Sequence, residues 1–347
     1  MISVIIPLHN LGSKGDYCLK KCLDSLLIQT YKDFEVLLME NGSTDDTVDV
    51  AKEYCNKDGR FKLFILDTTG IANARNKGIA NSEGMYITFI DGDDYVSKDY
   101  LENLYNPYIS HDNTGLSIVP CYLDYVKKNK LKKLPLNYTA RVLDNESKIE
   151  IFSDGTVWAK LYSKKILDEN NIQFDTELFG VDDNLFISEY RLCVDNIAIS
   201  DKGAYYYVQG RTGQTTINRM NNMLDGIIKL NTKLYNVYLK HNVQEKYKSF
   251  LDYELIMLFM GKDFASTALS KMPKVYIDNT IKTFENRLLQ IIPDTVYCAE
   301  WQIKWFKRFI FFAKHGYGSF FLKFMRFYRN IILQPLGIKY KAKQITS

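Results

Sequence analysis

The chain has 347 residues, of which 46% are apolar and 25% are charged, and its net charge is +4. A chain of this length and composition can bury one large core or two smaller ones, as soluble globular proteins do. No apolar run reaches the roughly 18 residues that a membrane-spanning helix needs, so the sequence excludes a protein built on spanning helices.

Two further features concern the compartment. The six cysteines are scattered, without a Cys-x-x-Cys pair or a histidine at metal-ligand spacing, which indicates reduced thiols. The first residues, MISVIIPLHN, lack the basic segment and the cleavage site of a secretory signal. We therefore expect a cytoplasmic protein.

Strand-like and helical segments alternate through the first 120 residues. The strand-like segments are rich in β-branched and aromatic residues and are nearly continuously apolar, which is typical of buried, largely parallel strands. They cover residues 2–6, 34–39, 62–66, 85–90 and 116–120. Helical periodicity lies between them, at residues 17–29, 44–55 and 71–81. This alternation predicts a Rossmann-like α/β/α sandwich.

The pattern becomes mixed from residue 121 and mostly helical from residue 217. Long helical periodicity is found at residues 223–241 and 253–272. The predicted regions are a first domain at 1–216, with halves at 1–115 and 116–216, and a mostly helical C-terminal region at 217–347.

The loop after the first strand excludes two common ways of binding a nucleotide. No GxxxxGK[ST] sequence is present, and Gly12 and Gly15 form only a GxxG spacing. Neither a Walker loop nor a dinucleotide fingerprint is therefore present. A nucleotide would have to be held by other groups.

Three carboxylates, Asp91, Asp93 and Asp94, follow the apolar segment at 85–90. Carboxylates this close repel one another unless a cation lies among them, and hard oxygen ligands suit Mg²⁺ or Mn²⁺. The alternative is a solvated Asp-Gly hairpin turn. The next residues, 97–105, predict a helix and not a returning strand, which argues against the hairpin, but short acidic runs are common on surfaces and the pattern alone leaves both alternatives open.

Polar side chains also follow the strand at 34–39. Ser43 and Asp45 are fully explained as residues that cap or precede a helix. Glu40 and Asn41 are not, because they lie at the carboxyl end of a strand, where open α/β sheets bind ligands.

Several stretches together resemble a known family. VIIPLHN, CLDSLLIQTYKDFEVLLMENGSTDDT and GIANARNKGIANSEGMYITFIDGDD are similar to successive signatures of the family 2 glycosyltransferases, inverting enzymes with the GT-A fold. The resemblance covers residues 2–110 and continues weakly at 155–167, 174–190 and 205–216. The order and spacing of these motifs make the resemblance specific, although each motif alone is weak.

The resemblance implies a donor site for a UDP-sugar. Glu40 would face the uracil base and Arg75 would meet the diphosphate. Asp91 would contact the ribose or the metal, while Asp93 and Asp94 would hold Mn²⁺ or Mg²⁺ against the diphosphate. The other donor-binding residues would be Pro7, Leu8, His9, Asn10, Asn73 and Gly92.

The resemblance also implies that Asp183 is the catalytic base, with Asp182 beside it. The chemistry agrees, because a metal and Arg75 can neutralise the leaving diphosphate while one carboxylate deprotonates an acceptor hydroxyl. Such a direct displacement inverts the anomeric centre. The alternative for both aspartates is a solvated turn ahead of a helix, whose first turn favours acids.

The chain departs from the family pattern at three places. Glu40–Asn41 replaces Asp–Asp, His9 replaces a common Tyr before a longer loop, and Val181–Asp182 replaces Gly–Glu. Two further residues have open assignments. Trp158 could stack on an acceptor sugar or belong to the core. Arg211 could close over the diphosphate or be a solvated loop residue.

The last 47 residues are basic and aromatic. Residues 301–347 contain ten Lys and Arg and no Asp or Glu, whereas residues 1–300 contain 35 basic and 41 acidic residues. Trp301, Trp305, Phe309 and Phe312 form one predicted stripe, and Phe320, Phe324, Phe327 and Ile331 form a second. Such a tail fits the surface of an anionic membrane. The alternative is packing on the enzyme or on another subunit, and a nucleic-acid partner fits less well.

These features predict a glycosyltransferase on the cytoplasmic face of the cell membrane. It would transfer a sugar from a UDP-sugar to a glycan acceptor, carried on a polyprenyl lipid, during assembly of capsule, O-antigen or exopolysaccharide. The alternatives are a binding scaffold without catalysis and a sugar nucleotidyltransferase. The sequence does not reveal the sugar, the acceptor hydroxyl or the oligomeric state.

Overall fold

The structure is a computed structural model that describes most of the chain. The described residues are 1–12, 19–134, 139–152, 154–209, 220–260, 269, 272–291 and 300–327. The chain divides into two compact units. Unit 1 comprises Met1–Glu177 and Asp182–Thr215, and unit 2 comprises Leu178–Val181 and Thr216–Ser347. The short segment Leu178–Val181 thus belongs to unit 2, whereas the sequence boundaries place it in the first domain.

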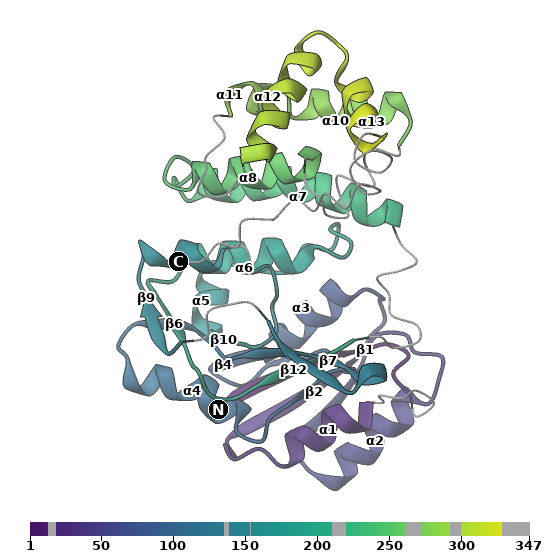
Figure 1. The fold of residues 1–347 in the computed structure, drawn as a ribbon. Coiled ribbons are helices and arrows are strands. Elements are labelled where there is room, and N and C mark those ends of the chain that lie inside the picture. The colour runs from purple at the N-terminus through teal and green to yellow at the C-terminus, as the bar shows by residue number, and fades with distance from the viewer. Residues whose placement is uncertain are drawn as a thin grey trace. The chain divides into compact units, whose positions relative to one another are not determined.

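The first half of unit 1 is the predicted α/β sandwich (Figure 1). Four parallel strands pair in the order β3-β2-β1-β4. Their bounds are Phe61–Ile65 (β3), Phe34–Glu40 (β2), Ile2–Leu8 (β1) and Tyr86–Phe89 (β4). One face of the sheet carries α3 and the other carries α1 and α2. These helices span Leu19–Leu27 (α1), Thr47–Lys57 (α2) and Ile71–Asn81 (α3). Because β1 and β2 are buried along their whole length, their sequences are continuously apolar.

The second half of unit 1 extends the same sheet but mixes strand directions. Beyond β4 the order is β10-β6-β11-β9. These strands span Lys160–Ser163 (β10), Thr114–Ile118 (β6), Asn196–Ile199 (β11) and Arg141–Leu143 (β9). Strand β10 is antiparallel to β4 and β6, and β9 is antiparallel to β11. The helices are α4 at Tyr100–Ser110, α5 at Lys164–Glu169 and α6 at Asp182–Leu192, with 3-10 turns η1 at Val126–Lys128 and η2 at Ser147–Ile151.

A second, four-stranded sheet in unit 1 was not predicted. Its order is β5-β12-β7-β8, and β12 runs parallel to β7 and antiparallel to β5. The strands span Tyr95–Val96 (β5), Tyr205–Gln209 (β12), Cys121–Tyr125 (β7) and Lys130–Lys133 (β8). Strand β5 directly follows Asp94, so the pairing of β5 with β12 places the acidic turn beside β12.

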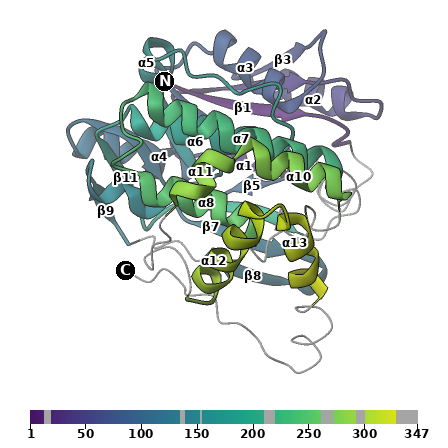
Figure 2. The same cartoon turned by 90° about the horizontal axis from the view of Figure 1, so that it is seen from above.

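Unit 2 is helical, as predicted for the C-terminal region. Its described helices are Met220–Lys240 (α7), Lys248–Met260 (α8), Lys274–Thr283 (α10), Glu285–Gln290 (α11), Glu300–Lys314 (α12) and Gly318–Phe327 (α13). Helices α12 and α13 pack against each other (Figure 2). Unit 2 has its own apolar core, which includes Leu255, Phe259, Phe309 and Phe321. Within the residues that the structure describes, we find no helix with the length and apolar character needed to cross a bilayer.

Candidate active site

The carboxylates of Asp91, Asp93 and Asp94 lie together in a turn directly after β4. The backbone N–H of Asp94 donates to the Asp91 carbonyl at 2.9 Å, which closes the turn. One carboxylate oxygen from each of the three residues lies within 4.8 Å of the others. Gly92 packs against the end of β1, where a Cβ atom would come within 2.6 Å of the Leu11 side chain. The fold therefore brings the predicted metal ligands into one cluster of hard oxygen atoms.

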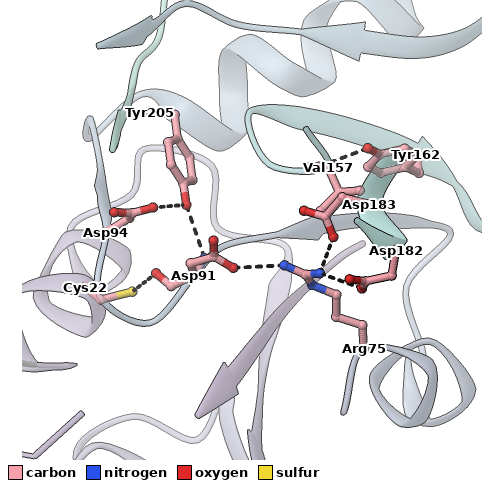
Figure 3. Close-up of polar contacts among 9 residues, drawn as sticks. All are labelled: Cys22, Arg75, Asp91, Asp94, Val157, Tyr162, Asp182, Asp183 and Tyr205. Atoms are coloured by element: carbon pink, nitrogen blue, oxygen red, sulfur yellow. Dashed lines mark hydrogen bonds and ion pairs between the residues drawn. The ribbon is translucent and has the colours of Figure 1, made fainter. Parts of the chain in front are cut away.

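Strand β12 holds the innermost carboxylate of this cluster (Figure 3). Asp94 is buried, and its two oxygens accept hydrogen bonds from the Tyr205 hydroxyl at 2.7 Å and the Val208 N–H at 2.8 Å. The Tyr205 hydroxyl also accepts from the N–H of Asp91 at 3.2 Å. Burial, together with the charges of Asp93 and Asp91, raises the pKa of Asp94 well above its usual value. A divalent cation would relieve the same repulsion, so the donor set fits Mg²⁺ or Mn²⁺.

Arg75, in α3, connects this cluster to a second pair of carboxylates. Its Nη2 donates to Asp91 at 3.1 Å, and its Nη1 donates to Asp183 and, at 3.3 Å, to Asp182. The guanidinium is buried, and its Nε has no hydrogen-bond partner among the described residues. Burial alone would lower the pKa of Arg75, but the charges of Asp183, Asp91 and Asp182 outweigh it and raise the pKa above its ordinary value. Arg75 is therefore a fixed positive charge.

Asp182 and Asp183 form the first turn of α6 and point toward Arg75 (Figure 3). The Asp182 side chain is buried, and that of Asp183 keeps 28% of its surface exposed. Enclosure by the protein raises the pKa of Asp183, the charge of Arg75 lowers it and the charges of Asp182 and Asp91 raise it, and together these effects place the pKa at about 7. Burial also raises the pKa of Asp182. Asp182 and Asp183 are therefore bonded to Arg75 and largely enclosed, which argues against a solvated acidic turn, and their catalytic assignment remains a prediction.

Contacts that the sequence analysis did not predict hold Arg75 close to Asp183. Asn76 exchanges two hydrogen bonds with the backbone of Phe174, each 2.8 Å long. The Phe174 ring stacks on Phe186 of α6, with centroids 4.0 Å apart. These contacts join α3 to α6 next to the reacting groups. Asn76 lies inside the ARN motif, which is the only local signal that could have pointed to it.

The predicted nucleotide pocket lies at the carboxyl ends of β1 and β2. Pro7 and Leu8 are the last residues of β1 and are buried. The ring Nδ1 of His9 hydrogen-bonds the Asn41 carbonyl at 3.0 Å. Asn10 adopts a φ of 53°, and its side-chain oxygen accepts the N–H of Thr44 at 2.8 Å. The two loops therefore hold each other at the edge where α/β sheets bind ligands.

Glu40 is buried and bound to its own loop. Its Oε2 accepts the Ser43 hydroxyl at 2.8 Å, and its Oε1 accepts the Ser43 N–H. Ser43 does not cap α2, which begins at Thr47. The neighbouring Asn41 is also buried, and its Oδ1 has no hydrogen-bond partner among the described residues. The uracil contact predicted for Glu40 remains a prediction, and Asn41 offers a second acceptor at the same strand end.

Three predicted residues remain, and two of them are described. Asn73 donates to the Thr68 hydroxyl and carbonyl. Trp158 is only 8% exposed and stacks on Tyr205 with ring centroids 4.8 Å apart and an 11° angle. This placement supports the core alternative, because one indole face is already covered. Arg211 lies outside the described residues.

The protein resembles known proteins both in its fold and in its sequence. The structure is similar to that of *Staphylococcus aureus* TarS 1–349 in complex with UDP-GlcNAc, with a TM-score of 0.72, 20% identity and coverage of 98% of this chain and 93% of that one. The fold is that of the GT-A glycosyltransferases. Residues 3–170 match the family described as Glycosyl transferase family 2. This part of the chain, just under half of its 347 residues, is a domain of that family.

Two curated relatives are similar along part or most of the chain. Glycosyltransferase GlyA of *Streptococcus pneumoniae* is 29% identical over 218 residues, which are 59% of this chain and 30% of GlyA. Poly(ribitol-phosphate) beta-N-acetylglucosaminyltransferase TarP of *S. aureus* is 27% identical over 298 residues, which are 81% of this chain and 88% of TarP. The chain thus spans less than a third of GlyA.

Proposed function

We propose that the protein is an inverting glycosyltransferase that moves one sugar from a UDP-sugar to a hydroxyl group of a glycan, with the help of a divalent metal. The observation that carries this proposal is the single buried guanidinium of Arg75 between Asp91 of the acidic turn and Asp183 of α6. Leaving-group stabilisation and proton removal need groups on opposite sides of the reacting carbon, and Arg75 connects two such groups.

Asp91, Asp93 and Asp94 would hold Mn²⁺ or Mg²⁺. When bound, the ion would supply positive charge to the departing diphosphate. Arg75 would supply a second, permanent charge, and its buried Nε has no hydrogen-bond partner among the described residues. UDP-sugars are proposed as donors because TarS, which shares the fold, was solved with UDP-GlcNAc.

Asp183 would remove the proton of the attacking acceptor hydroxyl. A carboxylate with a pKa of about 7 holds a proton well enough to accept it from an alcohol and is still ionised in half of the molecules at neutral pH. Asp182, which also bonds Arg75, would keep the guanidinium in place while Asp183 acts. Attack on the face opposite the diphosphate inverts the anomeric centre.

The acceptor is proposed to be a growing cell-surface polysaccharide carried on a polyprenyl lipid. Two features support this proposal: the resemblance to the transferases of surface polysaccharides and the basic, aromatic C-terminal residues. A lipid-linked acceptor places the enzyme on the inner face of the cell membrane, as a peripheral protein.

The proposal is tested by UDP release from a panel of UDP-sugars, with Mn²⁺ and with a chelator. We expect slow, metal-dependent release from one donor, which would also name the sugar. Release should be lost in Asp93→Asn, which weakens metal-dependent donor binding. If no donor is hydrolysed, calorimetry of donor binding separates an enzyme from a binding scaffold. Metal-dependent binding of one donor supports the enzyme. Metal-independent binding, with no turnover for any acceptor, supports a scaffold.

A nucleotidyltransferase would release pyrophosphate from a nucleoside triphosphate and a sugar phosphate, and this reaction is the control. We expect no pyrophosphate, because the first loop, PLHNLGSKGD, supplies only Lys14 and not the Gly-rich, basic sequence that a triphosphate needs. Pyrophosphate formation by the wild type would contradict the proposed reaction.

A further inference from the structure

Helices α12 and α13 expose a surface that carries aromatic and basic side chains. We define the α12–α13 surface by the side chains that the structure shows as exposed: Lys304, Lys307, Arg308, Phe311, Lys314, Tyr317, Phe320, Lys323 and Phe324. Five of these nine residues are basic, and none is acidic. The surface thus combines one sign of charge with large apolar rings.

The aromatic residues of this surface are not those of the first predicted stripe. Phe309 is fully buried, and Trp305 and Phe312 pack on Phe321 with centroid distances of 5.9 and 5.0 Å. The expectation that this stripe faces a membrane is therefore wrong for these three residues, because they pack against α13, and the side chain of Trp301 lies outside the described residues. The second predicted stripe is different, since Phe320 and Phe324 of α13 are exposed.

The exposure of the aromatic rings is large for a water-facing helix pair. Phe320 is 63% exposed, Tyr317 61%, Phe311 60% and Phe324 44%. Single exposed apolar residues are ordinary, but a cluster with a basic border marks an interaction surface. Residues 320 and 324 have the i, i+4 spacing of one helix face. This face of α13 therefore presents two rings, and the exposed Tyr317 directly precedes the helix.

The charges around the surface decide between the candidate partners. Helix α10 packs against α13 and contributes Asp278, which attracts Lys323 and forms an ion pair with Lys274 at 2.7 Å. Lys304, Lys307, Arg308 and Lys314 lie on α12. A second copy that docked through the same surface would bring these like charges together. An anionic bilayer would instead attract them.

We propose that the α12–α13 surface binds an anionic lipid bilayer, with Phe320 and Phe324 in the headgroup region and the basic residues against the anionic headgroups. Aromatic rings prefer the interface of a bilayer, and basic residues near it each add about fivefold in partitioning. This inference rests on the peripheral location proposed above and does not depend on the proposed reaction.

The test is co-sedimentation of the full chain with vesicles of phosphatidylcholine alone or mixed with phosphatidylglycerol, two parts to one. We expect binding to the mixed vesicles only, weakened by salt. The double variant Phe320→Ser/Phe324→Ser and the double variant Lys307→Glu/Arg308→Glu should each lose about tenfold or more in binding. The matched controls change exposed residues of unit 1, with Met85→Ser/Ile109→Ser for the rings and Lys52→Glu/Lys77→Glu for the charges, and should bind normally.

Three results would overturn the inference: no binding to either vesicle, equal binding to both, or equal losses in the control variants. A fall in oligomer size for Phe320→Ser/Phe324→Ser in sedimentation velocity, without any loss of vesicle binding, would assign the surface to a protein partner instead. Circular dichroism and thermal unfolding of each variant should match the wild type, because the changed side chains are exposed. UDP release without vesicles is measured in parallel, so that a failure of binding and a failure of the reaction are told apart.

Discussion

Two groups of charges in this molecule have opposite environments. Around Arg75 in unit 1, positive and negative groups are enclosed and bonded to each other, and several pKa values move far from their ordinary range. On the α12–α13 surface of unit 2, the basic residues are exposed and outnumber their acidic neighbours. Enclosed charges of both signs suit chemistry on a bound substrate, whereas exposed charges of one sign suit attraction of a large charged partner.

The largest expected effect in the enclosed group is that of Asp183→Asn. Loss of the general base should lower transfer by on the order of 10²–10⁴-fold, while donor binding stays near the wild-type value. Transfer is measured with a lipid-linked or synthetic acceptor, and donor binding by calorimetry. Asp175→Asn is the control, since it removes a nearby acid that does not bond Arg75. Wild-type turnover in Asp183→Asn would exclude Asp183 as the base.

The next largest effect should come from Arg75→Ala. Removal of this buried charge leaves Asp91, Asp182 and Asp183 without their shared partner, which should destabilise the fold by about 3–5 kcal/mol. Activity should fall by on the order of 10²–10³-fold. Denaturant unfolding and UDP release measure the two effects.

Arg75→Lys separates charge from geometry. A single ammonium keeps the positive charge but cannot bond Asp91 and Asp183 as the guanidinium fork does. We expect it to restore part of the stability but little of the activity. Full activity in Arg75→Lys would show that the bridge between the two carboxylates is not needed.

The pH dependence of activity and stability should follow Asp183. Below pH 7 the rate should fall about tenfold per pH unit, as the base becomes protonated.

The raised pKa of Asp183 also means that the folded protein binds this proton more tightly than the unfolded chain does. The resulting stability is fully present below the ordinary aspartate pKa of about 3.9 and is lost as the pH rises through about 7. Denaturation at a series of pH values should show a weaker slope in Asp183→Asn than in the wild type.

The smallest effect is expected for Tyr205→Phe. The change removes the hydroxyl that bonds Asp94 and the Asp91 N–H, at a cost of about 1 kcal/mol. The Mn²⁺ concentration for half-maximal activity should change severalfold, because the acidic turn loses its support. Tyr207→Phe on the same strand is the matched control. If both variants need the same Mn²⁺ concentration as the wild type, Tyr205 does not shape the metal site.

Local pattern was sufficient for the first two strands, which are buried along their whole length, and for one helix with a single buried face. The strands β1 and β2 and the helix α3 lie where their apolar runs and helical periodicity predict them. The acidic cluster was also predictable, since its three residues are neighbours in the sequence. The family resemblance indicated Arg75 and Asp183 separately, but only the fold shows that they bond each other.

The rest depended on contacts between distant segments. The hydrogen bond from Tyr205 to Asp94 joins residues that are 111 positions apart. The hydrogen bonds between Asn76 and Phe174 join residues that are 98 positions apart. No local periodicity encodes such pairs. In the tail, the aromatic stripes were visible in the sequence, but which stripe becomes buried depends on how α12 and α13 pair. An amphipathic pattern therefore predicts that one face of a helix is covered, but it does not identify the segment or partner that covers it.

The pairing of β5 with β12 has a consequence for folding during synthesis. The strands that carry Asp91 and Asp94 can form early, but the groups that bond the Asp94 carboxylate lie 111 and 114 positions later in the chain. Until the ribosome has released the segment at 205–209, a nascent chain lacks both groups that bond the Asp94 carboxylate. We expect the acidic turn to stay in exchange with open forms until that segment emerges, so that the late strand completes the second sheet and the acidic cluster in one step.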